Sequence, residues 1–87
     1  MSEITDRNRE TLIIAQEECA EIIQVISKIL RFGWRDDKYD NRERLTAEVG
    51  DLLCMVDLMI EQNLIDADLT AAIENKRNKL KMWSNII

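Results

Sequence analysis

The sequence contains no histidine and no proline, and only two of its 87 residues are glycine. Without histidine there is no histidine general base, no histidine-ligated zinc and no Ser-His-Asp triad. Without proline, and with so little glycine, the chain lacks the residues that build repeated tight turns, which disfavours a β fold rich in hairpins. We therefore expect helices, and any catalytic site must use other side chains.

Long apolar runs and positive charge are also scarce. The longest uninterrupted apolar run is Leu52–Val56, far shorter than the roughly 20 residues of a membrane span. The N-terminal residues lack the basic and apolar segments of a signal peptide. The net charge of −5 disfavours a protein that coats nucleic acid. We expect a cytoplasmic protein with no membrane or nucleic-acid partner, in which Cys19 and Cys54 are reduced and buried.

The length and the apolar spacing predict a single all-α domain over residues 1–87. Glycine can adopt the left-handed conformation that ends a helix, and aspartate caps the first turn of one. The expected helices run from Asp6 to Phe32, from Asp40 to about Asn63 and from Asp66 to about Trp83, with Gly33 ending the first helix and Asp40 and Asp66 capping the other two.

Apolar residues recur every three or four positions in each predicted helix, which indicates a buried face. The first two helices carry more apolar residues than one hairpin can bury. We therefore expect an antiparallel helical hairpin plus a third helix, assembled into a dimer or tetramer helical bundle. The expected inward residues are Leu12, Ala15, Cys19, Ile22, Ile26 and Ile29, then Leu45, Val49, Leu52, Val56, Met59 and Ile60, and finally Leu69, Ala72, Ile73, Lys76 and Leu80.

Two pairs of acidic residues interrupt the apolar pattern. Glu18 and Glu21 are three positions apart on the first predicted helix, and Glu48 and Asp51 are three apart on the second. Such pairs lie one above the other on a helix. Carboxylates gathered in a poorly solvated place need cations to neutralise them, and an all-oxygen set suits Mg²⁺ or Mn²⁺ better than Zn²⁺. Gly50, between Glu48 and Asp51, is consistent with a close backbone approach there. Either pair alone is common on a solvated helix, but the combination favours a metal site.

The segments Glu17–Glu21 and Glu48–Asp51 resemble the E-E-x-x-E and E-x-x-D motifs of the MazG-like all-α nucleoside triphosphate pyrophosphohydrolases. The segment Lys76–Asn85 is similar to the tail of small phage and bacterial members. The resemblance implies a Mg²⁺- or Mn²⁺-dependent, oligomeric hydrolase that converts a nucleoside triphosphate to the monophosphate and pyrophosphate. It also implies that Glu18, Glu21, Glu48 and Asp51 are metal ligands, and that Glu17 supports a second metal or the attacking water.

Several other residues are candidates for contacts with the substrate. Four basic residues fall within six positions, at Lys76, Arg77, Lys79 and Lys81, and of these we expect Lys76 and Lys79 to bind the outer phosphates. The alternative is that they complement the helix dipole. Trp34 is the best candidate for stacking on a base, or else it caps the core. Lys28 either touches a phosphate or is a solvated lysine near the helix end. Weaker aromatic candidates are Tyr39 and Trp83.

The leading hypothesis is thus a hydrolase of nucleotide metabolism that acts on a (deoxy)nucleoside triphosphate, with a dNTP such as dGTP favoured by the resemblance. A phosphoribosyl-ATP pyrophosphohydrolase of the same superfamily is the alternative within this class, because both enzymes cut the α–β phosphate bond. A helical oligomerisation or protein-binding module, in which the carboxylates pair with Arg42, Arg44 or Lys28, is the alternative outside it.

Overall fold

The computed structural model describes residues 3–35 and 40–87, and its regular elements are three helices: α1 (Asp6–Phe32), α2 (Asn41–Glu61) and α3 (Thr70–Trp83). Neither described range contains a β-strand. The prediction of an all-α fold is therefore confirmed. None of the helices in these ranges combines the length and apolar character that crossing a bilayer requires.

Side-chain and backbone caps fix the ends of α1 and the start of α2. The Thr5 hydroxyl accepts a hydrogen bond from the Asn8 amide at 3.1 Å, which begins α1. Gly33 ends α1 with φ 86°, a conformation that glycine adopts at little cost. The Asp40 carboxylate accepts from the amides of Arg42 and Glu43 at 3.0 and 3.3 Å. The predicted roles of Gly33 and Asp40 are confirmed.

The C-terminus of α2 is closed by a Schellman motif. The Leu64 amide donates to the Met59 carbonyl at 2.8 Å and the Asn63 amide to the Ile60 carbonyl at 3.0 Å. Asn63 has φ 59°, which asparagine tolerates better than most residues. These bonds satisfy carbonyls that the last turn leaves unpaired and fix the direction in which the chain leaves α2.

The start of α3 differs from the prediction. α3 begins at Thr70, four residues after the expected cap Asp66. The Asp68 carboxylate accepts from the Thr70 amide at 2.9 Å. Hydrogen bonds to the Thr70 side chain and then to its amide lower the pKa of Asp68. Leu69 occupies the N-cap position of α3, and no side chain caps the helix. The predicted capping role of Asp66 is therefore wrong, and Asp68 holds only the amide of the first helical residue.

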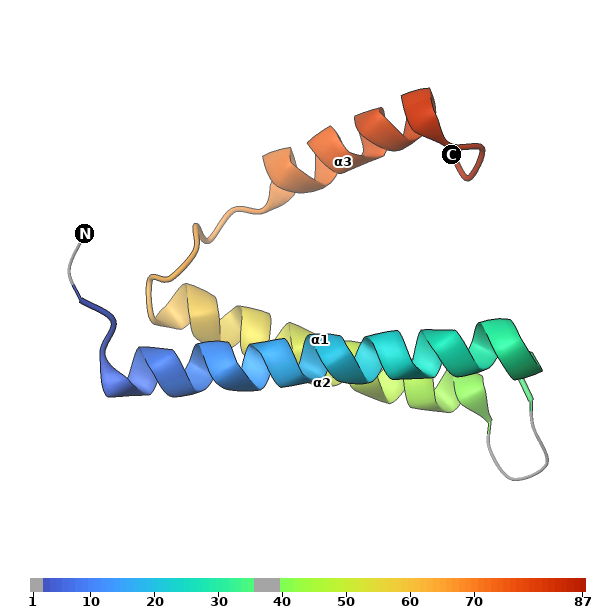
Figure 1. Ribbon diagram of the computed structural model, residues 1–87. Helices are drawn as coiled ribbons and strands as arrows, with labels where there is room; N and C mark the ends of the chain where they lie inside the picture. The colour runs from blue at the N-terminus through green and yellow to red at the C-terminus, as the bar shows by residue number, and fades with distance from the viewer. Residues whose placement is uncertain (1–2, 36–39) are drawn as a thin grey trace.

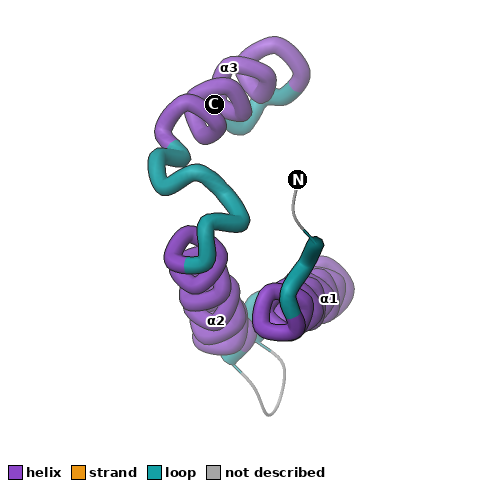
Figure 2. Tube along the Cα trace, turned by 90° about the vertical axis from the view of Figure 1, so that its left-hand side faces the viewer, coloured by secondary structure: helices purple, strands orange, loops and turns teal. Residues whose placement is uncertain are grey.

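α1 and α2 lie side by side and run in opposite directions, whereas α3 lies apart from both (Figures 1 and 2). The side chains buried between α1 and α2 include Ala15, Val25 and Met55, of which Val25 is 1% exposed. Asn41 is completely buried and donates from Nδ2 to the Gly33 carbonyl at 2.9 Å. Gln62 donates from Nε2 to the Thr11 hydroxyl at 2.9 Å. These two bonds tie α1 to α2 near both ends of the pair.

The predicted inward face of α1 and α2 is right in part. Ala15, Ile22, Leu45 and Leu52 face the other helix as expected, whereas the prediction was wrong for Leu12, Cys19, Ile26 and Val49. The face that packs between the helices follows Thr11, Ala15, Glu18, Ile22 and Val25 on α1, and Leu45, Glu48, Leu52 and Met55 on α2. Leu12, Ile26 and Val49 are consequently exposed. Cys19 and Cys54 are free thiols as expected, but both are exposed rather than buried. α3 has no buried residue, so its predicted inward face packs on nothing in the described chain.

The two open sides of the α1–α2 pair differ in chemistry. Because the helices are antiparallel, residues one position after an inward residue fall on the same side in both. The side so defined, the apolar face, consists of Leu12, Cys19, Ile23, Ile26 and Leu30 of α1 and Val49 and Leu53 of α2. The opposite side, the acidic face, carries Glu10, Glu17 and Glu21 of α1 and Asp51 of α2.

The chain is extended for its size. Its radius of gyration is 16.0 Å, whereas a compact domain of this length has a radius of about 12 Å. Its accessible surface is 7427 Å², about 2,000 Å² more than a compact monomer of its mass exposes. Much of the excess is apolar, since Leu30, Met82 and Trp83 are each more than 80% exposed.

Candidate metal centre

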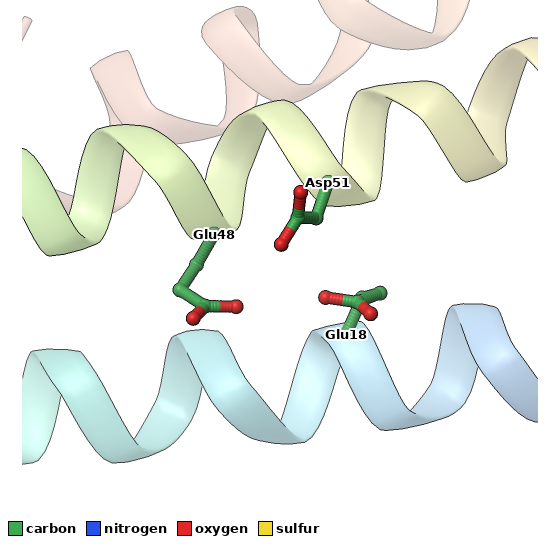
Figure 3. A group of neighbouring side chains, drawn as sticks. All are labelled: Glu18, Glu48 and Asp51. Atoms are coloured by element: carbon green, nitrogen blue, oxygen red, sulfur yellow. The ribbon is translucent and has the colours of Figure 1, made fainter.

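Three of the predicted ligands converge between α1 and α2. Glu18 projects from α1, and Glu48 and Asp51 project from α2 toward it (Figure 3). Each carboxylate offers one oxygen, and these oxygens all lie within 4.8 Å of one another. Glu18 and Glu48 are half-buried and Asp51 is exposed, so the cluster opens from the helix contact onto the acidic face.

The surroundings of Glu18 disfavour its ionised form. The pKa of Glu18 is raised above its ordinary value of 4.5, first by desolvation and then by the charges of Asp51, Glu48, Glu21 and Glu17. Each of these causes favours the neutral carboxyl, because burial and nearby negative charge both penalise the ionised form. A cation bound among the carboxylates would relieve this penalty.

The fourth predicted ligand, Glu21, lies outside the trio. Glu21 and Glu17 are both exposed on the acidic face. Their charges act on Glu18, so both are close enough to influence the cluster. The structure thus brings Glu18, Glu48 and Asp51 together and leaves Glu17 and Glu21 at their margin.

The donor set fits a hard divalent cation. Mg²⁺ takes oxygen ligands at about 2.0–2.1 Å, which places neighbouring ligand oxygens about 3 Å apart and opposite ones about 4 Å apart. Oxygens within 4.8 Å of one another reach those separations by small side-chain rotations. All three side chains of the trio offer oxygen and none offers sulfur or nitrogen. Mg²⁺ and Mn²⁺ prefer such oxygen ligands, whereas zinc does not.

The predicted substrate contacts are not gathered at the cluster. Lys28 is half-buried on α1, ten residues and therefore about 15 Å along the helix from Glu18. Lys76 and Lys79 are exposed on α3, which contacts neither α1 nor α2 among the described residues. Trp83 is likewise exposed at the end of α3. Tyr39 lies outside the described residues.

Trp34 lines a pocket of about 740 Å³ where α1 connects to α2. The pocket is walled by Trp34, Arg35, Asp40, Arg42, Leu45 and Thr46. Two arginines beside an exposed aromatic ring suit an anion attached to a planar group. The sequence analysis did not predict that Arg35 and Arg42 line a pocket. Their positions beside the connection that carries Trp34 could have suggested it.

No family model, curated protein or solved structure matches the chain.

In the absence of metal, the contribution of Glu18 to stability should fall as the pH rises. Its folded-state pKa lies above the ordinary 4.5, so the folded chain holds this proton more tightly than the unfolded chain. The contribution of Glu18 to stability is then fully present below pH 4.5 and is lost as the pH rises from 4.5 through the raised pKa. We expect Glu18→Gln to flatten this decline, measured as melting temperature against pH in EDTA.

The exposed Asp57 on α2 provides the control for this measurement. Asp57→Asn should leave the decline as it is in the wild type. A decline of equal size in Glu18→Gln would remove Glu18 as its source.

Proposed function

We propose that this chain is a metal-dependent nucleoside triphosphate pyrophosphohydrolase, which hydrolyses a (deoxy)nucleoside triphosphate to the monophosphate and pyrophosphate. The observation that carries the proposal is the convergence of Glu18, Glu48 and Asp51, with oxygens within 4.8 Å of one another. The resemblance of Glu17–Glu21 and Glu48–Asp51 to the paired acidic motifs of MazG-like enzymes names the reaction.

The metal-holding residues in this proposal are Glu18, Glu48 and Asp51, with Glu21 as a fourth ligand from the acidic face. When bound, Mg²⁺ or Mn²⁺ supplies charge neutralisation at the phosphate oxygens and a water of lowered pKa. The half-buried positions of Glu18 and Glu48 limit the access of bulk water to one side of the cluster. A triphosphate would therefore approach from the acidic face, where Asp51 is exposed.

Glu17 has a separate role in the proposal. It is exposed one residue before Glu18, so its carboxylate is free to accept a hydrogen bond from the attacking water or to support a second ion. Water attacks the α-phosphorus, and the leaving pyrophosphate carries the charge that the basic residues of α3 would meet.

The proposal includes a homo-oligomer, either a dimer or a tetramer. The apolar face holds side chains such as Ile23, which is 65% exposed, and Leu53, which is 58% exposed. Contiguous apolar surface of this kind is characteristic of protein interfaces. Covering it with another copy would leave the acidic face open to substrate.

A screen of the eight common NTPs and dNTPs with Mn²⁺ tests the activity. We expect pyrophosphate, not orthophosphate, to be released from at least one of them, with a dNTP such as dGTP as the first candidate. Glu48→Gln should abolish the release and Asp57→Asn should not. If no substrate yields pyrophosphate and Mg²⁺ produces no thermal shift, the carboxylates have a structural role in a helical interaction module.

The basic residues of α3 should act on the substrate and not on the metal. Lys76→Ala with Lys79→Ala is expected to raise KM for the triphosphate several-fold and to leave Mg²⁺ affinity nearly unchanged. Lys81→Ala is the matched control on the same helix. Unchanged kinetics in the double variant would assign Lys76 and Lys79 to the helix dipole instead.

A further inference from the structure

The pocket at the connection between α1 and α2 takes no part in the proposed hydrolysis. Its volume of about 740 Å³ is within the range of about 300–1,000 Å³ that small-molecule sites have. Trp34 forms part of its wall and is 58% exposed, so its ring is accessible from solvent. The pocket therefore has room for a small molecule and an aromatic ring on which that molecule can stack.

Two guanidinium groups at the pocket favour an anion. Arg35 and Arg42 both line it, and neither side chain makes an ion pair or a hydrogen bond with the described residues. Asp40 also lines the pocket, but its carboxylate already accepts from the amides of Arg42 and Glu43. These three side chains together carry one net positive charge. Guanidinium groups bind phosphate through paired hydrogen bonds, so a phosphate is the group that this wall fits best.

A buried side chain holds the backbone of this wall in place. Asn41 is completely buried, and its Nδ2 donates to the Gly33 carbonyl at 2.9 Å. The Asn41 amide donates to the Trp34 carbonyl at 3.0 Å. Arg35 pairs with Asp40 in an isolated antiparallel bridge. The wall is thus formed before a ligand arrives, which lowers the entropic cost of binding.

The pocket and the carboxylate cluster open on different sides of the hairpin. One row on α2 has spacings of four, three and four, and it consists of Arg42, Thr46, Val49 and Leu53. This row lies on the side of the apolar face, to which Val49 and Leu53 belong. The cluster opens instead onto the acidic face, where Asp51 is exposed. A ligand in the pocket therefore enters from the side opposite to a triphosphate at the cluster.

Distance along the helices also separates the two sites. Arg42 lies six residues before Glu48 in α2, which is about 9 Å along the helix axis. Trp34 lies beyond the end of α1, which is fourteen residues or about 21 Å from Glu18. A nucleotide held at the cluster by its phosphates would bring a neutral base, and no second anion, to the arginines. The anion that the arginines favour must therefore belong to another molecule.

We propose that this pocket is a second nucleotide site, which binds a nucleoside monophosphate without metal. The base stacks on Trp34, and Arg35 and Arg42 bind the phosphate. Every base can stack on an aromatic ring, so these contacts select the class of ligand and not one base. The inference goes beyond the proposed function and does not rest on it, because no residue of the carboxylate cluster takes part.

Fluorescence titration in EDTA tests the site. The Trp83→Phe chain retains Trp34 as its only tryptophan, so quenching by AMP or GMP reports a base that stacks on this ring. We expect saturable quenching by both. Adenosine lacks the phosphate and should bind about tenfold more weakly or worse, because the charge-assisted hydrogen bonds are lost. Inorganic phosphate lacks the base and should compete with AMP only at much higher concentration.

Substitutions assign the binding to the pocket. Arg42→Gln should weaken AMP binding by about tenfold or more. The matched control is Arg9→Gln, since Arg9 is also exposed but lies near the other end of the hairpin, and it should bind AMP as the wild type does. Calorimetry of Trp34→Ala should show a similar loss without depending on fluorescence. Glu48→Gln should leave AMP binding in EDTA unchanged.

Three results would overturn the inference. The first is an equal loss of binding in Arg42→Gln and Arg9→Gln, which would reflect general charge attraction. The second is AMP binding that requires Mg²⁺ and is lost in Glu48→Gln, which would place the nucleotide at the carboxylate cluster. The third is no saturable binding to the wild type, as when another copy covers the pocket. All of these measurements proceed without hydrolysis, so a failed pyrophosphate assay and a failed second site are distinguishable.

Discussion

Asp51→Asn should reduce pyrophosphate release by about 100-fold or more while making the metal-free protein more stable. Loss of outer-sphere partners of metal ligands already costs about 10- to 100-fold in metal affinity or activity, so loss of a ligand should cost at least as much. Stability should move in the opposite direction, because the substitution removes one of the negative charges that act on Glu18. Melting curves in EDTA should therefore shift upward by a few degrees.

Added Mg²⁺ separates the metal site from a structural carboxylate. An ion that binds only the folded state stabilises it by mass action, so Mg²⁺ should raise the melting temperature of the wild type far more than that of Asp51→Asn. Asp57→Asn, an exposed acid-to-amide change on the same helix, should behave as the wild type in every measurement. A less stable Asp51→Asn in EDTA that still hydrolyses nucleotide would refute the metal centre.

The ends of the helices were predictable because local residues determine them. Gly33 and Asp40 act on backbone groups within a few residues, and the observed caps agree with the prediction. The start of α3 was harder to predict, because Asp66 and Asp68 are equally good capping residues in the sequence. The hydrogen bond from the Thr70 amide to Asp68 depends on the loop conformation after Asn63, which spacing does not reveal.

The phase of the hairpin contact could not be read from apolar periodicity. α1 has apolar residues around much of its circumference, so two adjacent faces fit the pattern equally well. The contact follows the face that includes Glu18, and it leaves Leu12, Ile23 and Ile26 exposed. One apolar face of α1 can pack inside the hairpin while the adjacent face packs against another copy. The sequence alone does not tell which of the two faces has which neighbour.

The candidate site was predictable to the extent that it depends on helix spacing. Glu48 and Asp51 are one turn apart whatever the tertiary structure, and pairing with Glu18 needed only an antiparallel neighbour. The roles of Lys76 and Lys79 depend on where α3 lies, and no local rule determines the position of a helix that contacts neither α1 nor α2.

Ile23→Glu should dissociate the oligomer without unfolding the hairpin. Ile23 is 65% exposed in one chain, and a surface substitution at such a position usually changes stability by no more than about 0.5 kcal/mol. If the apolar face is covered by a second copy, the same glutamate is buried without a partner at a cost of several kcal/mol. A tenfold increase in dissociation constant corresponds to about 1.4 kcal/mol, so the loss should exceed 100-fold. Sedimentation velocity over a concentration series measures it, and Leu53→Glu should act in the same way from α2.

Ile13→Glu is the matched control, since Ile13 is also exposed on α1 but points away from both α2 and the apolar face. This variant should sediment as the wild type does, because its glutamate stays in water. Equal dissociation by Ile13→Glu and Ile23→Glu would mean that added charge, and not the apolar face, governs assembly. A folded wild-type chain that sediments at 10.2 kDa at every concentration would contradict the oligomer itself.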